Sequence, residues 1–183
     1  MPGYLKYQDT STGQVVVEHR TKLGACNAMT QNIHNAVIHL GHQNGTVTLW
    51  TPNLPHPAVR LLAHMGPVSS LSVDPSTGGR YMATSGQDGT VKIWDCRNWK
   101  GAVRQWSTRG NGAELEWSQK GALAVAVGGS VNVSARHRWT ESYRSDIIPS
   151  YCCRFIPSHR YKHHSLHTSH HHYISPILFL TGH

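Results

Sequence analysis

The alternation of hydrophobic and polar positions in residues 1–133 predicts short β-strands. Short runs rich in Val, Ile, Thr and Trp are separated by clusters of Gly, Pro, Asn and Asp, and no window shows the helical period of an amphipathic helix. The expected strands form groups of four, with incomplete groups at both ends: 5–7 and 14–17; 25–29, 36–40, 46–50 and 58–62; 68–73, 80–85, 90–94 and 102–106; 113–117, 121–127 and 130–133. The pattern therefore predicts an all-β fold.

One segment of the chain occurs twice. Gly-His-Gln-Asn-Gly-Thr-Val-Thr-Leu-Trp at 41–50 returns as Gly-Gln-Asp-Gly-Thr-Val-Lys-Ile-Trp at 86–94, so that Trp50 and Trp94 lie 44 residues apart. The Asn-Gly and Asp-Gly pairs signal tight hairpin turns, because these residue types tolerate positive φ. A period in the forties that ends in Trp94-Asp95 is typical of β-propeller blades. Trp50, Trp94 and Asp95 are thus the expected blade motif, and a blade is a scaffold unit without chemistry of its own.

The repeat predicts only part of a propeller. Residues 1–133 hold about three blades, whereas roughly four to eight close a propeller, so we expect open β-edges that can pair with other strands. After Val133 the pattern stops: residues 134–183 contain 9 of the 15 histidines, the adjacent Cys152 and Cys153, and two acids, Glu141 and Asp146. This segment is predicted to be a His-rich basic tail, irregular and either disordered or foreign to the fold.

Several stretches carry a more specific likeness, namely 26–32, 35–42, 44–47, 49–50, 81–86 and 92–95. They resemble the nucleolar WD-repeat family of the small-subunit processome, whose members associate with U3 small nucleolar RNA in early ribosome assembly. The resemblance covers residues 1–133. It implies a propeller scaffold in the nucleus, at the nucleolus, that binds other processome proteins and pre-ribosomal RNA or small nucleolar RNA and catalyses no reaction.

The resemblance also implies a hydrogen-bonded tetrad in the second full blade. In such propellers it joins a His of the inter-blade loop, a Ser or Thr of the second strand, an Asp of the hairpin turn and the Trp of the third strand; the candidates are His64, Thr84 or Ser85, Asp88 and Trp94. A set of His, Ser and Asp also invites a catalytic interpretation, but no nucleophile elbow or oxyanion-type Gly motif accompanies it. We therefore expect a structural role, and we expect no enzymatic activity, cofactor or small-molecule substrate.

The chain is basic, which favours negatively charged partners. It has 17 Lys and Arg against 9 Asp and Glu, a formal net charge of +8 and a pI near 9.6, a balance that suits nucleic acid. Arg97, Lys100, Arg104 and Arg109 form the densest basic group. They could contact RNA phosphates or could equally keep strand edges soluble.

Two other functions stay open at this stage. Trp94, Asp95 and Arg97 match the Trp-Asp-x-Arg box of substrate receptors for cullin-RING ubiquitin ligases. This adaptor box is short and also arises in ordinary WD repeats. A chain with so few blades could alternatively be a truncated isoform without a function of its own.

The histidines of the tail do not predict a metal site. His163 and His167, or His167 and His171, would share a helix face at a spacing that suits zinc or nickel. Because no carboxylate or cysteine stands at ligand spacing, only adventitious metal binding is expected there. No apolar stretch is long enough to span a membrane and no signal-peptide pattern opens the chain, so no membrane partner is expected.

Overall fold

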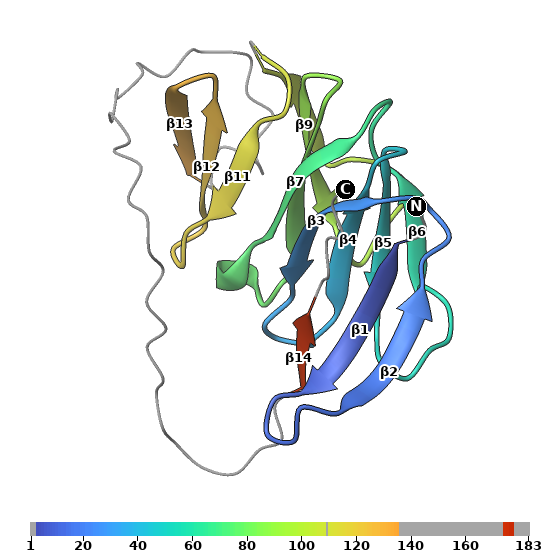
Figure 1. The fold of residues 1–183 in the computed structure, drawn as a ribbon. Helices are drawn as coiled ribbons and strands as arrows, with labels where there is room; N and C mark the ends of the chain where they lie inside the picture. The colour runs from blue at the N-terminus through green and yellow to red at the C-terminus, as the bar shows by residue number, and fades with distance from the viewer. Residues whose placement is uncertain (1–2, 109, 136–173, 178–183) are drawn as a thin grey trace.

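The computed structural model describes residues 3–108, 110–135 and 174–177, which form four antiparallel sheets (Figure 1). Sheets B and C each have four strands in chain order. Sheet B consists of β3 (Cys26–Gln31), β4 (Ile38–His42), β5 (Thr46–Trp50) and β6 (Val59–Leu62). Sheet C consists of β7 (Val68–Val73), β8 (Tyr81–Gly86), β9 (Thr90–Asp95) and β10 (Arg104–Ser107), with a short 3-10 helix, η1 (Pro75–Thr77), after β7.

The two flanking sheets have three strands each. Sheet D consists of β11 (Glu114–Trp117), β12 (Ala122–Val127) and β13 (Ser130–Ala135), and sheet A places β14 (Ile174–Ile177), β1 (Tyr4–Asp9) and β2 (Val15–Arg20) side by side in that order. Every strand expected within residues 1–133 is present, so the predicted all-β, partial propeller is confirmed.

The predicted boundary at residue 133 and the tail beyond it stay a prediction. β13 continues to Ala135 and β14 lies inside the segment predicted as a tail. The remainder of 134–183 lies outside the described residues.

Glycine permits the hairpins between second and third strands. Gly45 has a φ of 80°, and a Cβ atom there would lie 2.0 Å from the carbonyl oxygen of His64. Asn44 accepts the backbone N–H of Thr46 at 3.1 Å through its side-chain oxygen. Gly89 takes the same place in sheet C with a φ of 71°. Among the described residues the positive φ stands at the glycine of each pair and not at Asn44 or Asp88, so the primed turn expected from both residues of the pair is corrected. Asn44 and Asp88 contribute instead by accepting the backbone N–H two residues on.

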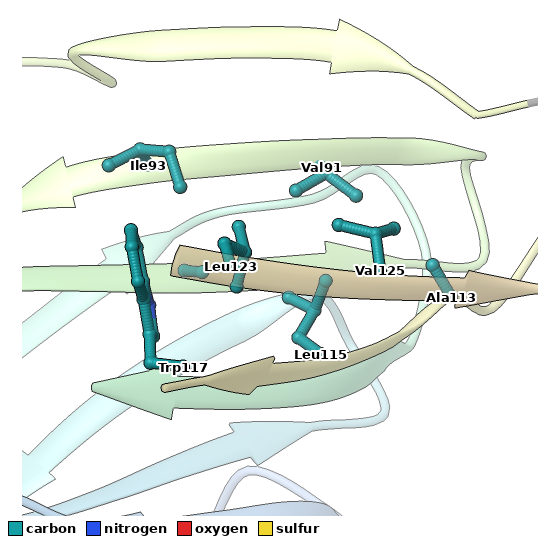
Figure 2. Packing of buried hydrophobic residues seen from close by; sticks show 8 residues of the cluster. Val91, Ile93, Ala113, Leu115, Trp117, Leu123 and Val125 are labelled. Carbon is teal, nitrogen blue, oxygen red and sulfur yellow. The ribbon is translucent and has the colours of Figure 1, made fainter. Parts of the chain in front are cut away.

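Apolar side chains fill the space between successive sheets. Because successive side chains of a strand point to opposite faces, each inner sheet contributes one set of residues to each neighbour. Figure 2 shows Val91 and Ile93 of sheet C facing Leu115, Leu123 and Val125 of sheet D. The buried residues are Leu5, Tyr7, Cys26, Ile38, Leu40 and Trp50 between sheets A and B; Val47, Leu49, Ala63, Val68, Leu71, Met82 and Trp94 between B and C; and Ala83, Val91, Ile93, Ala113, Leu115, Trp117, Leu123 and Val125 between C and D.

Two serines of β7 join the first strands of sheets C and D. The Ser70 hydroxyl oxygen accepts the backbone N–H of Leu115, and the Ser72 hydroxyl oxygen accepts that of Trp117, each at 3.1 Å. All four residues are buried. A buried N–H that loses its acceptor is costly, so these two contacts tie the sheets together beyond their apolar packing.

We expect Ser72→Ala to lower the free energy of unfolding by about 1–3 kcal/mol, because the N–H of Trp117 loses this acceptor. Ser69→Ala is the matched control: within the described part of the chain, the Ser69 hydroxyl is buried without a hydrogen-bond partner, so its removal should be nearly neutral. Urea unfolding followed by circular dichroism measures both variants. Equal losses in the two variants would contradict the role given to Ser72.

Candidate functional site

Four of the residues predicted as a tetrad meet between sheets B and C. The Trp94 indole nitrogen lies 2.9 Å from the Thr84 hydroxyl oxygen, which lies 2.9 Å from His64 Nε2. His64 Nδ1 lies 3.1 Å and 3.2 Å from the two carboxylate oxygens of Asp88. The structure therefore brings the inter-blade loop, β8, the β8–β9 turn and β9 together through one chain of contacts.

The chemistry of the end groups gives this chain of contacts a single direction. An indole N–H can only donate and a carboxylate can only accept. Trp94 therefore donates to Thr84, the Thr84 hydroxyl donates to His64 Nε2, and His64 donates through Nδ1–H to Asp88. The neighbours of His64 thus select one tautomer of its imidazole.

The pKa values match a neutral imidazole beside a carboxylate. Burial lowers the pKa of His64 below its usual value, although Asp88 acts in the opposite direction. Burial alone would raise the pKa of Asp88, but hydrogen bonds from the Thr90 side chain and the Met65 backbone, together with His64, lower it to about 2. At neutral pH the contact is therefore a hydrogen bond to a carboxylate and not an ion pair.

This arrangement supports a structural interpretation. His64 and Thr84 are 1% and 0% exposed, so a substrate cannot reach the Thr84 hydroxyl without opening the interface between the sheets. Ser85, the alternative candidate, lies outside the network, since its hydroxyl donates to the carbonyl of Ala113. The structural role of the tetrad stays a prediction, and the geometry gives the catalytic alternative no accessible nucleophile among these residues.

A second network, in sheet B, was not predicted from the sequence. The Trp50 indole N–H donates to the Thr48 hydroxyl at 2.8 Å, and this oxygen lies 2.7 Å from His42 Nε2. His42 Nδ1 lies 3.5 Å from the sulfur of Cys26. The Trp50 ring stacks on His19 of β2 with ring centroids 5.3 Å apart, so the network also connects sheet B to sheet A.

The sheet B network differs from the tetrad because it contains no carboxylate. Burial, and then the positive charge of Arg60, lower the pKa of His42 to about 4. Burial raises the pKa of the Cys26 thiol, which keeps it protonated and poorly nucleophilic. The sequence feature that could have revealed this network is the spacing of Thr48 and Trp50, since positions two apart on a strand share a face.

Asp95, which ends the repeat, binds two arginines. Its carboxylate accepts hydrogen bonds from Arg80 at 3.0 Å and 3.1 Å and from the backbone N–H of Arg97 at 3.0 Å. Partial burial would raise the pKa of Asp95, but these contacts lower it. The Arg97 side chain is 64% exposed, whereas Trp94 is buried. Of the adaptor-box residues, Arg97 therefore faces solvent and Trp94 faces the core.

The predicted basic group lies partly within the described structure. Arg97 and Lys100 share the exposed turn after β9, and Arg104 begins β10. Arg109 lies outside the described residues, as do His163, His167 and His171. Within residues 3–108, 110–135 and 174–177, no group of three or more His, Cys, Asp or Glu could hold a metal ion, and no helix has the length and apolar character needed to cross a membrane.

Comparison with known proteins gives a consistent picture. Residues 56–95 match the family model described as WD domain, G-beta repeat. The chain is 50% identical over 131 residues to U3 small nucleolar RNA-associated protein 7 of Saccharomyces cerevisiae. The matched region covers 72% of this chain and 23% of that protein. It is 44% identical over 136 residues to WD repeat-containing protein 46 of Homo sapiens, covering 73% and 22% of the two chains.

A third relative is more distant. The chain is 36% identical over 83 residues to the ribosome biogenesis protein BOP1 homolog of Chlamydomonas reinhardtii, covering 42% of this chain and 10% of that protein. The resemblance expected from the sequence is thus confirmed. The chain spans less than a quarter of the length of these relatives.

Proposed function

The chain is a WD-repeat protein with a partial propeller, and on this premise we propose that it is a non-enzymatic scaffold in small ribosomal subunit biogenesis. It acts in the nucleus, at the nucleolus. Its partners are other processome proteins and pre-ribosomal RNA or small nucleolar RNA. The observation that carries the proposal is the 50% identity over 131 residues to a protein named for its association with U3 small nucleolar RNA. The positive net charge of +8 supports it.

Affinity purification of the tagged chain from nuclear extract tests this function. We expect enrichment of U3 small nucleolar RNA and of processome proteins. Trp50→Ala serves as the control for binding that requires folded sheets, because Trp50 lies in the core between sheets A and B. Failure of the wild-type chain to enrich either class would contradict the proposal, and would favour the interpretation as a truncated isoform.

Direct RNA contact is expected to depend on the exposed turn after β9. The double variant Arg97→Glu and Lys100→Glu should weaken binding to a short single-stranded RNA roughly tenfold. It should also reduce the slope of log affinity against log salt concentration by about 1 to 2, because binding with fewer phosphate contacts releases fewer counterions from the RNA. Fluorescence anisotropy at several salt concentrations measures both quantities.

The matched control carries the same change of charge elsewhere. Lys22→Glu with Lys120→Glu alters two other exposed lysines and should leave the affinity closer to that of the wild type. If both double variants weaken RNA binding equally, the effect comes from net charge and not from the turn after β9.

The adaptor function is a second candidate, favoured by the 64% exposure of Arg97 next to Asp95. If it holds, a ligase adaptor should copurify with the chain, and Arg97→Ala should abolish its capture without loss of stability. Capture of U3 small nucleolar RNA without any ligase adaptor would exclude this candidate.

A further inference from the structure

The four sheets form a row in the order A, B, C and D, with a core between each pair of neighbours. Figure 1 shows this row, from β11, β12 and β13 at one end to β1 and β2 at the other. Within the described part of the chain, no further sheet packs on the outer face of sheet D, away from sheet C, or on the outer face of sheet A, away from sheet B. The side chains on these two faces therefore indicate what can pack there.

The outer face of sheet D combines small apolar side chains with two carboxylates. Side chains alternate along a strand, so this face bears the residues that do not point to sheet C: Glu114 and Glu116 of β11, Ala122, Ala124 and Ala126 of β12, and Val131 and Val133 of β13. Val133 is 57% exposed, and both glutamates are exposed. Among the described residues neither glutamate forms an ion pair. The face is thus apolar across β12 and β13 and negatively charged along β11.

The two glutamates stand at positions that make contacts between sheets elsewhere in the row. Glu116 lies opposite Ala124 of β12, just as Ser72 of β7 lies opposite Ala83 of β8. Ser72 accepts the backbone N–H of Trp117 across the interface between sheets C and D. Sheet D carries a longer and negatively charged acceptor at the same place. A carboxylate bonds most strongly to a cationic donor, so the charge on this face favours a basic neighbour.

The outer face of sheet A has the opposite character. Because Leu5 and Tyr7 point to sheet B, this face bears long side chains with a surplus of positive charge: Tyr4, Lys6 and Gln8 of β1, and Glu18 and Arg20 of β2. Lys6 Nζ lies 2.9 Å from Glu18 Oε2, and Arg20 Cζ lies 5.9 Å from the centroid of the Tyr4 ring. In the described part of the chain Arg20 has no carboxylate partner. This face is therefore complementary to the outer face of sheet D in both charge and side-chain length.

We propose that a second copy of this chain packs the outer face of its sheet A on the outer face of sheet D, and that the same contact forms a second time between the two remaining faces. Glu114 and Glu116 of each copy then lie against the face that carries Lys6 and Arg20 of the other. The alanines of β12 leave room for the long side chains of β1.

The number of sheets determines where this assembly stops. Contacts between two different faces of identical chains either close into a ring or continue into a filament. Two copies with four sheets each bring eight sheets, which lies within the roughly four to eight blades of closed propellers. A third copy exceeds this range. The expected assembly is therefore a closed dimer.

Size-exclusion chromatography with light scattering on the full chain measures the assembly. We expect a molar mass near twice the 20.3 kDa of one chain, with no further growth when the protein concentration is raised. The mass of a single chain throughout the concentration range would overturn the contact between copies. A mass that keeps growing with concentration would overturn the closed dimer.

Two charge-reversal variants test whether these two faces make the contact. Glu114→Lys with Glu116→Lys makes both outer faces positive, and Lys6→Glu with Arg20→Glu makes both negative, so each variant alone should be monomeric because like charges repel. An equal mixture places opposite charges at both contacts and should recover the dimer, which a misfolded variant could not do. If the mixture stays monomeric while both variants retain the circular dichroism spectrum of the wild type, the proposal is wrong.

The double variant Arg97→Glu and Lys100→Glu is the matched control. It makes the same change of net charge as Lys6→Glu with Arg20→Glu, but on the turn after β9 of sheet C, which is an inner sheet of the row. This control should remain dimeric. Loss of the dimer here as well would mean that net charge, and not the two outer faces, governs the association, and would overturn the proposal.

Discussion

Replacing Trp50 by alanine is expected to lower the free energy of unfolding by about 3–5 kcal/mol, the usual cost of removing a fully buried Trp side chain. Trp50 is 1% exposed, lies in the core between sheets A and B, stacks on His19 and donates to Thr48. Domains of ordinary stability unfold with about 5–15 kcal/mol, so this variant should be close to unfolding. Urea unfolding followed by far-ultraviolet circular dichroism measures the loss.

Two further variants separate the volume of the ring from its hydrogen bond. Trp50→Phe keeps one aromatic ring while it removes the N–H donor to Thr48 and the smaller ring of the indole, so it should cost about 1–3 kcal/mol, less than Trp50→Ala. Trp99→Ala removes a tryptophan that is only partly buried beside the core between sheets B and C, and should cost less than Trp50→Ala. If Trp50→Phe is as damaging as Trp50→Ala, the ring volume is not the main source of stability at this position.

The strands could be predicted from the sequence because each one carries its own local signal. β5 and β9 begin after Asn-Gly and Asp-Gly turns and end at Trp50 and Trp94, and their apolar residues alternate with polar ones. The tetrad candidates came from the family resemblance, and the local signals only supplied the positions on which His64, Asp88 and Trp94 could be matched to it. Thr84 and Ser85 are neighbours on β8 and point to opposite faces, so only the structure decides between them.

The sheet B network could not be predicted by transferring the tetrad from sheet C. Thr84 is paired with Lys92 on β9, and the corresponding pair in sheet B is Leu40 with Thr48. Leucine stands where the tetrad needs a hydroxyl, so the search for a tetrad ends there. The hydroxyl comes instead from Thr48 on the neighbouring strand β5. The sequence alone does not show that Leu40 and Thr48 are paired, so the replacement of one position by the other becomes visible only in the structure.

β14 was missed for a different physical reason. Its four residues include a proline, and such a short run carries no alternation that distinguishes a strand from an irregular segment. Its pairing with β1 joins opposite ends of the chain. A contact of this kind is determined by the available edge and not by the local sequence.

Lowering the pH from 8 to 5 is expected to destabilise the protein by about 2 kcal/mol for each of His39 and His42, because both must be neutral in the fold. His39 is 1% exposed, and among the described residues its Nδ1 has no hydrogen-bond partner. Burial lowers its pKa to about 4, and burial with the charge of Arg60 does the same for His42. Below pH 6.5 the unfolded chain therefore binds more protons than the folded one, so stability falls as the pH decreases towards 4.

The pH window distinguishes the histidines from the carboxylates. The pKa of Asp88 is lowered to about 2, so its contribution to stability is complete above the ordinary carboxyl range and is lost only below about pH 4. Urea midpoints at pH 8, 6 and 5 should thus report His39 and His42, together with His64, whose pKa burial also lowers. His39→Leu should remove its own part of the decrease, about 2 kcal/mol, while His56→Leu, at an exposed position, leaves the decrease intact. Stability that stays constant between pH 8 and 5 would mean that the folded protein can protonate both buried imidazoles, which would require water or a carboxylate to reach them through the interface between the sheets.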